Sequence, residues 1–295
     1  MKTFSIAELE KYSLIKAHTF RTWEQRFDVF KSTRADNNRR VYTIEELEFL
    51  LNFCLLNRLG NKVSELAILS KNAIEVKVLG LKGNSAKQEQ LINRLIVDMF
   101  SLDIERFELT LKNSLSSWGT EETVEEIILP FLERLELFSY KGRTSSEYHF
   151  VVTAIRKRLL LAIDTTSLQQ ANSKSVLLFL PEGEHYDLLL LYLNYKLRKT
   201  GFNVLYLGTN ISAANLHYTL KHRKPNFVVT YVPSNDEKYM KKLPTWFLHE
   251  DNSTSYFVAT ATLFEKQSSY KAKFISYKEI LREMVPVSSD SFFDA

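Results

Sequence analysis

The stretch SVLLFLPEGEHYDLLLLYLNYKLRKTGFNVLYLG (residues 175–208) sets the fold of the last third of this 295-residue chain. Residues 175–180 and 203–208 are short apolar runs, and the segment between them is a polar loop followed by a run long enough for a helix. Strands that are apolar throughout are typical of parallel sheets covered on both faces. The stretch therefore predicts a strand, loop, helix and strand of an α/β fold.

The pattern continues toward the C-terminus, with apolar runs at 226–232, 255–261 and 272–277 and a helical segment at 212–223. Alternating strands and helices predict a parallel, doubly wound sheet of the flavodoxin or Rossmann type, which binds ligands at the carboxyl ends of its strands. Four polar residues follow the first strand there, namely Glu184, His185, Tyr186 and Asp187. One histidine and two carboxylates in a loop are a weak metal pattern, so solvated loop residues are the alternative and no metal site is predicted.

Glycine and cysteine counts exclude several classes of protein. The eight glycines are too widely spaced to form GxGxxG or GxxxxGK, which removes the usual dinucleotide and phosphate loops. Cys54 is the one cysteine, so there is no internal disulfide, and its apolar neighbours predict a core position. The sequence lacks a signal peptide and an apolar run of about 18 residues, which predicts a soluble, cytoplasmic protein without membrane contact.

The middle of the chain has the period of helices. Segments 86–100, 104–117, 121–138 and 145–164 each carry an apolar stripe, and short links join them. Four such helices predict a four-helix bundle, with a plain connecting scaffold as the alternative interpretation. Pro130 removes a backbone donor from the third helix and should bend it.

The first 75 residues are predicted to be helical and basic. Helices are expected at 6–12, 17–27 and from the Thr43 cap to about 57, and Phe20, Trp23 and Phe27 share one face of the second. Residues 11–40 contain eight Lys or Arg and three acids, a net +5, against +4 for the whole chain. Two helices and a basic loop predict a winged helix-turn-helix, and a small helical domain with a solvated basic loop is the alternative.

The segments FSIAELEKYSLIKAHTFRTWEQRFDVF (4–30) and NNRRVYTIEELEFLLNF (37–53) resemble the MerR-family DNA-binding domain. The matching residues are the T-x-R-x-W-E core, from Thr19 to Glu24, and the R-x-Y pair at the end of the wing, while Asn38 stands where the family has glycine. The resemblance implies that the second helix enters the major groove and that the wing meets phosphates of double-stranded promoter DNA. The DNA-binding residues that we predict are His18, Thr19, Arg21, Thr22, Gln25, Arg26, Arg34, Arg40 and Tyr42.

The order of head, bundle and LPEGEHYDLL loop resembles the cobalamin-binding MerR-type regulators, which include light-sensing repressors. Their loop reads G-E-x-H-x-x-G, with a histidine that ligates cobalt and a glycine that lets the nucleotide tail pass. Here Tyr186 stands at the ligand position, Leu189 stands at the glycine, and His185 is one residue early.

The upper-face motif of the light-sensing members, W-x9-E-H, is also altered. It becomes Phe138, Tyr148 and His149, and Thr230-Tyr231-Val232 replaces a Ser-x-Leu after the third strand. We therefore predict a degenerate ligand pocket made of Phe138, Tyr148, His149, Glu184, His185, Tyr186, Leu189 and Thr230. Each change adds bulk or removes a ligand, so the sequence predicts a cobalamin fold that does not bind cobalamin.

These patterns predict a multidomain chain with a helix-turn-helix domain at 1–75, a bundle at 76–170, an α/β domain at 171–285 and a tail at 286–295. The predicted function is a DNA-binding transcriptional regulator of repressor type without cofactor or catalytic residues. The alternatives are a sensor of another small molecule or partner protein in the same pocket and, less favoured, a corrinoid-dependent enzyme. RNA polymerase or a regulatory protein is a further expected partner. Since Gly80 and Gly83 interrupt any long coiled helix, self-association would use bundle or sheet surfaces.

Overall fold

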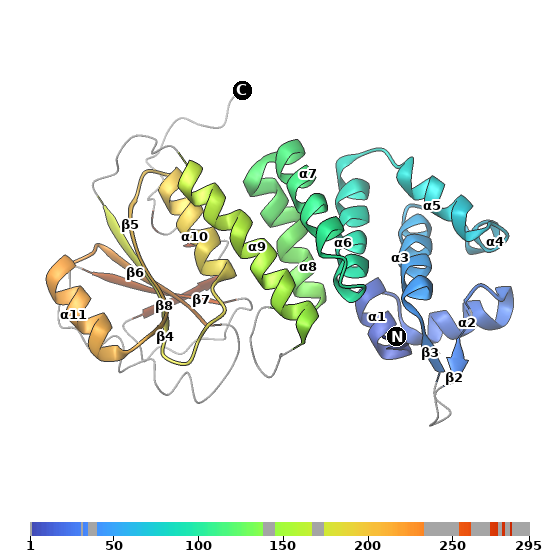
Figure 1. Cartoon of the computed structure of the whole chain (residues 1–295), viewed down its shortest axis with the longest axis horizontal. Coiled ribbons are helices and arrows are strands. Elements are labelled where there is room, and N and C mark those ends of the chain that lie inside the picture. Colours follow the sequence, from blue (N-terminus) through green and yellow to red (C-terminus); the bar gives the residue numbers. More distant parts are fainter. Residues whose placement is uncertain are drawn as a thin grey trace. The chain divides into compact units, whose positions relative to one another are not determined.

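The computed structural model describes residues 2–30, 32–34, 40–137, 145–166, 174–232, 254–260, 272–276, 279–280 and 284. They fall into two compact units (Figure 1). The first unit reaches Leu137 and includes the start of helix α9 up to Ala154, and the second begins at Ile155. The predicted tail at 286–295 and Phe138 lie outside the described residues.

The N-terminal part of the first unit is a small helical domain with a three-stranded antiparallel sheet, in the order β1-β3-β2. The predicted Thr43 cap is present, because its hydroxyl accepts from the Glu46 amide, and Ser5 caps α1 in the same way by accepting from the Glu8 amide. The predicted end of the first domain, residue 75, lies inside helix α5 (Lys71–Leu79). The elements are β1 (Phe4–Ser5), α1 (Ile6–Ser13), α2 (Ala17–Phe27), β2 (Thr33–Arg34), β3 (Arg40–Tyr42), α3 (Ile44–Arg58), α4 (Val63–Ala67) and α5 (Lys71–Leu79).

An aromatic cluster forms the core of this part. Phe20, Trp23, Phe30, Phe49 and Phe53 are buried, and neighbouring rings lie 5.4–6.3 Å apart in tilted and edge-to-face arrangements. Such pairs add to the stability that burial alone provides. The predicted apolar face of α2 is thus confirmed for its first two members, while Phe27 at the helix end is only half-buried. The predicted core position of the cysteine is also confirmed, because burial raises the pKa of the Cys54 thiol to about 12.

The rest of the first unit is helical. Its elements are α6 (Asn84–Phe100), α7 (Ile104–Thr123), a π-helical turn η1 (Val124–Ile128), α8 (Leu129–Arg134) and the start of α9 (Ser146–Thr165). The helix predicted at 121–138 is confirmed as far as Arg134: it follows a kink at Gly119 and runs through the end of α7, the π-helical turn η1 and α8. Gly119 has a positive φ of 75° that kinks α7, and Pro130 lies in the first turn of α8, where its missing N–H costs little.

One polar network joins the head to the helical region. The Glu89 carboxylate on α6 accepts two hydrogen bonds of 2.9 Å from Arg134 on α8 and also contacts Arg58 on α3. Arg134 continues to Asn93, at 3.2 Å. Burial alone would raise the pKa of Glu89, but the two guanidinium groups hold it below its usual value. The carboxylate is therefore ionised and holds three helices together.

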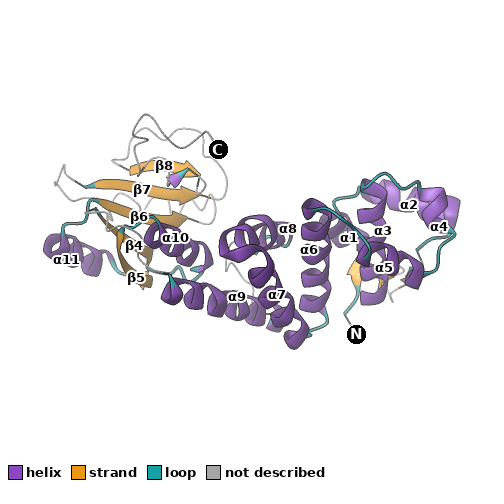
Figure 2. Cartoon of the chain, turned by 90° about the horizontal axis from the view of Figure 1, so that it is seen from above, coloured by secondary structure: helices purple, strands orange, loops and turns teal. Residues whose placement is uncertain are grey.

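The second unit is an α/β domain with a parallel sheet of order β5-β4-β6-β7-β8. Its strands are β4 (Ser175–Pro181), β5 (Asn203–Ile211), β6 (Phe227–Val232), β7 (Ser255–Thr260) and β8 (Ala272–Ser276), joined in part by α10 (Leu188–Lys199) and α11 (Ala213–Arg223). Figures 1 and 2 show β4 and β5 between α11 on one face and α10, with the second half of α9, on the other. The predicted multidomain fold class, a winged helix-turn-helix, a helical bundle and a doubly wound α/β sheet, is confirmed.

The sheet is buried on both faces. Leu177 and Phe179 of β4 pack with Leu216 and Leu220 of α11, while α10 buries nearly all its residues from Leu188 to Tyr195. A helix that is apolar all round is expected where it is covered on every side. Among the described residues, no helix is long and apolar enough to cross a membrane.

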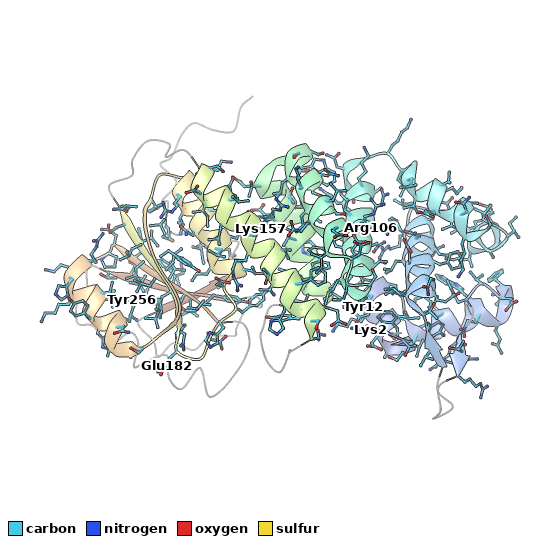
Figure 3. All side chains as sticks on the ribbon, viewed as in Figure 1. Lys2, Tyr12, Arg106, Lys157, Glu182 and Tyr256 are labelled. Carbon is cyan, nitrogen blue, oxygen red and sulfur yellow. The ribbon has the colours of Figure 1, made fainter. Side chains whose placement is uncertain are left out.

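Asp98 on α6 is a buried acid whose burial is only partly offset by nearby positive charges. Its side chain is fully buried, and its Oδ1 lies 3.2 Å from Nε of Arg106, a half-exposed side chain labelled in Figure 3. Burial, partly offset by the charges of Arg106 and Arg94, raises the pKa of Asp98 to about 6. Because the native state then binds this proton more tightly than the unfolded chain does, the contribution of Asp98 to stability decreases as the pH rises from about 4 to about 6.

We expect Asp98→Asn to increase the free energy of unfolding at pH 7.5 by about 1–2 kcal/mol, because the neutral amide avoids burying a charge. The gain should disappear near pH 4, where the native carboxyl is protonated. Urea unfolding followed by circular dichroism at both pH values measures it, and the exposed Asp164→Asn is the control. A wild type that is more stable than the variant at pH 7.5 would show that Arg106 outweighs burial.

Candidate DNA-binding surface and ligand loop

Helix α2 exposes a polar face opposite its aromatic one. His18, Arg21, Thr22, Gln25 and Arg26 are exposed, while Thr19 is half-buried. Leu14, which ends α1, has a left-handed φ of 61° and turns the chain into α2. The face therefore presents guanidinium, amide, imidazole and hydroxyl groups, which can pair with base edges and phosphates.

The wing carries two neighbouring arginines. Arg34 on β2 is paired in register with Arg40 on β3, and both side chains are exposed. Like charges directly opposite each other on a strand pair repel. An anion bound against Arg34 and Arg40 would reduce this repulsion. Arg21, Gln25 and Arg40 also line one open hollow between α2 and the wing.

Glu24 connects α2 to the wing. The Tyr42 hydroxyl donates to Glu24 Oε1 at 2.8 Å, and Arg40 Nη1 lies 3.6 Å from Oε2. Burial and the neighbouring carboxylate raise the pKa of Tyr42 well above its usual value, so the phenol stays a hydrogen-bond donor. The recognition helix and the last wing strand are thus fixed to each other.

The position of Tyr42 corrects one prediction. We expected it on the DNA-facing surface, but it is only 1% exposed, because its ring packs inward and its hydroxyl satisfies Glu24. Sequence reasoning also omitted Glu24 from the site, although it belongs to the T-x-R-x-W-E core. The sequence signal that could have identified it is the acidic residue of this core together with the basic and phenolic residues of the R-x-Y pair.

In the second unit, the loop between β4 and α10 is closed by backbone contacts. Gly183, at a positive φ of 89°, donates its amide to Asn210 Oδ1 at 2.8 Å. The Asn210 amide in turn donates to the carbonyl of Glu184 at 3.1 Å. The loop is therefore fixed to the carboxyl end of β5.

Asp187, at the end of this loop, is held by three hydrogen bonds. Its Oδ1 accepts hydrogen bonds from Arg156 on α9, at 2.9 Å from Nε and 2.7 Å from Nη2. Tyr206 on β5 donates to Oδ2 at 3.3 Å, and burial with the nearby carboxylate raises the pKa of that phenol well above its usual value. Sequence reasoning missed Arg156 and Tyr206, because no local pattern links either to the loop.

The predicted pocket residues are divided between the two units. In the second unit, Tyr186 and Leu189 are each 1% exposed and Thr230 is fully buried in β6, whereas Glu184 is half-buried and His185 is exposed. In the first unit, Tyr148 is buried and His149 is exposed. Within the described ranges, the structure places no three acidic, histidine or cysteine side chains where they could hold a metal ion.

The two helices, the wing and the exposed basic face define the N-terminal part as a winged helix-turn-helix domain. Residues 4–72 match the model of the MerR HTH family regulatory protein. The N-terminal part is thus similar to the MerR DNA-binding domain, as its resemblance predicted, and DNA binding is the activity of that domain class.

Two relatives from Myxococcus xanthus extend the similarity beyond the head. The chain is 25% identical to the HTH-type transcriptional repressor CarA over 227 residues, which are 77% of this chain and 75% of CarA. It is also 25% identical to the HTH-type transcriptional repressor CarH over 234 residues, 77% of this chain and 78% of CarH.

A solved structure supports the fold of the chain beyond the N-terminal head. The monomethylamine corrinoid protein of Methanosarcina barkeri superimposes with a TM-score of 0.53 at 11% identity, covering 67% of this chain and all of that one. At this identity the likeness establishes the fold alone, a helical region with an α/β domain like that of corrinoid proteins.

We expect Tyr42→Phe to reduce the stability of the head by about 1.5–3 kcal/mol, because a buried carboxylate loses its neutral donor. Differential scanning calorimetry of the full chain measures this change, and the exposed Tyr218→Phe is the matched control. If Tyr42→Phe unfolds at the same temperature as the wild type, the proposed link between α2 and the wing is contradicted.

Proposed function

We propose that this chain is a DNA-binding transcriptional repressor whose α/β unit does not bind cobalamin. The observation that carries the first half is the joint exposure of the α2 face and of the paired wing arginines, held together through Glu24. The curated relatives with this head are transcriptional repressors, which supports the direction of regulation. The function requires access to the genome and so a cytoplasmic location.

On this proposal the two groups of residues have different tasks. Arg21, Thr22 and Gln25 on the exposed face of α2 read base edges, because their donors point outward from the helix that enters the groove. Arg34 and Arg40 on the wing contact phosphates, which position the domain without reading sequence. Glu24 and Tyr42 keep the helix and the wing at one relative position.

The residues of the loop do not fit a corrin. A lower cobalt ligand is required at position 186, where Tyr186 is buried and could ligate a metal only as the phenolate. Leu189 fills the space that a glycine would leave for the nucleotide tail. Asp187 is already held by Arg156 and Tyr206, so the loop is fixed by the protein's own groups.

Substitution of one arginine in each group tests the DNA proposal. Duplexes selected by the wild type from a random pool are compared with unselected duplexes in a mobility-shift titration. Arg21→Ala should weaken binding to the selected duplexes by about 1–3 kcal/mol and leave unselected binding nearly unchanged. Arg40→Ala should weaken both about equally and reduce the salt slope by about 0.9. The control is the exposed Lys82→Ala, and a wild type that retards no duplex at low salt refutes the proposal.

The cobalamin half of the proposal has an independent test. The full chain is incubated with adenosylcobalamin in the dark, desalted, and examined by absorbance against a sample without protein. We expect no corrin absorbance in the protein fraction, because the ligand position and the tail channel are occupied by buried side chains. Corrin colour that stays with the wild type after desalting would refute the loss of binding while leaving DNA binding intact.

A further inference from the structure

Charge is divided between the two ends of the sheet in the second unit. Within residues 174–232, the acids are Glu182, Glu184 and Asp187, all in the loop at the carboxyl end of β4. Glu182 is labelled in Figure 3. Every lysine and arginine of this stretch lies instead near the amino ends of the strands. The basic edge is defined as Lys174, Lys199, Lys221, Arg223 and Lys224.

The topology brings these residues together. Because α10 and α11 run antiparallel to the strands, both helices end at the amino edge of the sheet. Asn226, just after α11, accepts the Ser175 amide at 2.8 Å, and the Asn203 amide donates to the Lys174 carbonyl at 3.1 Å. The segment after α11 and the starts of β4 and β5 therefore adjoin.

Helix dipoles explain only part of this accumulation. Cations are favoured in the last turn of any helix, and α10 and α11 each have three basic residues there. However, α6, α7 and α9 have none in their last turns. Lys174 and Lys224 lie outside the helices altogether. Helices α1, α2, α3, α5 and α8 each have one basic residue in the last turn, so three in each of α10 and α11, with two lysines beyond the helices, exceed what the dipole alone explains here.

The exposed part of the edge suits phosphates better than a protein surface. Lys199, Lys221, Arg223 and Lys224 are exposed. Among the described residues of this stretch, Tyr218 is the one large apolar side chain that is strongly exposed, at 67%. Protein interfaces rely on several buried aromatic or apolar anchors, whereas binding to the DNA backbone depends on cations that displace counterions.

We propose that the basic edge contacts the phosphate backbone of double-stranded DNA and gives this regulator a second DNA-binding surface. The inference rests on the proposed function, because the helix-turn-helix supplies the first contact. Once the head is bound, the edge is tethered near the same duplex, and a weak second site is then populated through its high effective concentration.

Salt-dependent binding of the full chain to random 40-bp duplexes tests the edge. The variant Lys221→Gln/Arg223→Gln/Lys224→Gln should reduce the slope of log affinity against log salt by about 0.9 for each phosphate that the edge no longer neutralises, up to about 2.7. The matched control is Lys82→Gln/Lys87→Gln/Lys112→Gln, which removes the same charge from exposed positions of the helical region. The control should keep the wild-type slope, and circular dichroism verifies that both variants are folded.

The outcomes separate this inference from the proposed function. If the wild type binds no duplex at low salt, the proposed function fails and the second surface fails with it. If the wild type binds and the edge variant keeps its slope, the second surface alone is refuted. The second DNA surface is also refuted if the edge variant keeps the wild-type salt slope for DNA but loses binding to poly-L-glutamate. That result would indicate an acidic protein as the partner of the basic edge.

Discussion

A carboxylate that leaves water must be matched by donors, because an ionised group in a protein interior is otherwise too costly to keep. In the head this constraint fixes the DNA-facing surface. Glu24 lies on α2, and both its hydrogen-bond donor Tyr42 and its ion-pair partner Arg40 lie on the wing strand, so one carboxylate links the two elements. The wing strand is only three residues long and could not be fixed by its backbone ladder alone.

The same constraint recurs where other distant segments meet. Glu89 is shared by Arg58 and Arg134, which connects the last long helix of the head to the helical region. Asp187 is matched by Arg156, which connects the ligand loop to α9. Each contact joins residues that are more than 30 positions apart, so each restricts the fold in a way that local propensity cannot. Asp98 is the exception, since burial outweighs Arg106, and it is therefore the acid whose protonation changes stability near neutral pH.

Much of the fold could be predicted because it rests on local signals. The helix at 17–27 follows from its apolar period, and the five strands follow from apolar runs separated by polar loops. The helix predicted at 121–138 is present as far as Arg134, after a break at Gly119 that lies between the two predicted helices. The prediction failed at Tyr42, because a motif gives spacing but not the side of the strand that the ring takes. Arg156 could not be found at all, since only the folded chain places it next to Asp187.

On the proposed function, the loop between β4 and α10 belongs to an α/β domain that keeps its shape without a bound corrin. The backbone features survive, namely Gly183 in its left-handed conformation and its bond to Asn210. Tyr186 of this loop and Leu189 of α10 are buried by the protein's own side chains. Arg156 and Tyr206 hydrogen-bond to Asp187 and so fix the position of the loop without a bound ligand. On the proposed function, the contribution of this domain to regulation is therefore a fixed surface, and the basic edge is the part of that surface whose charge matches the DNA that the head already binds.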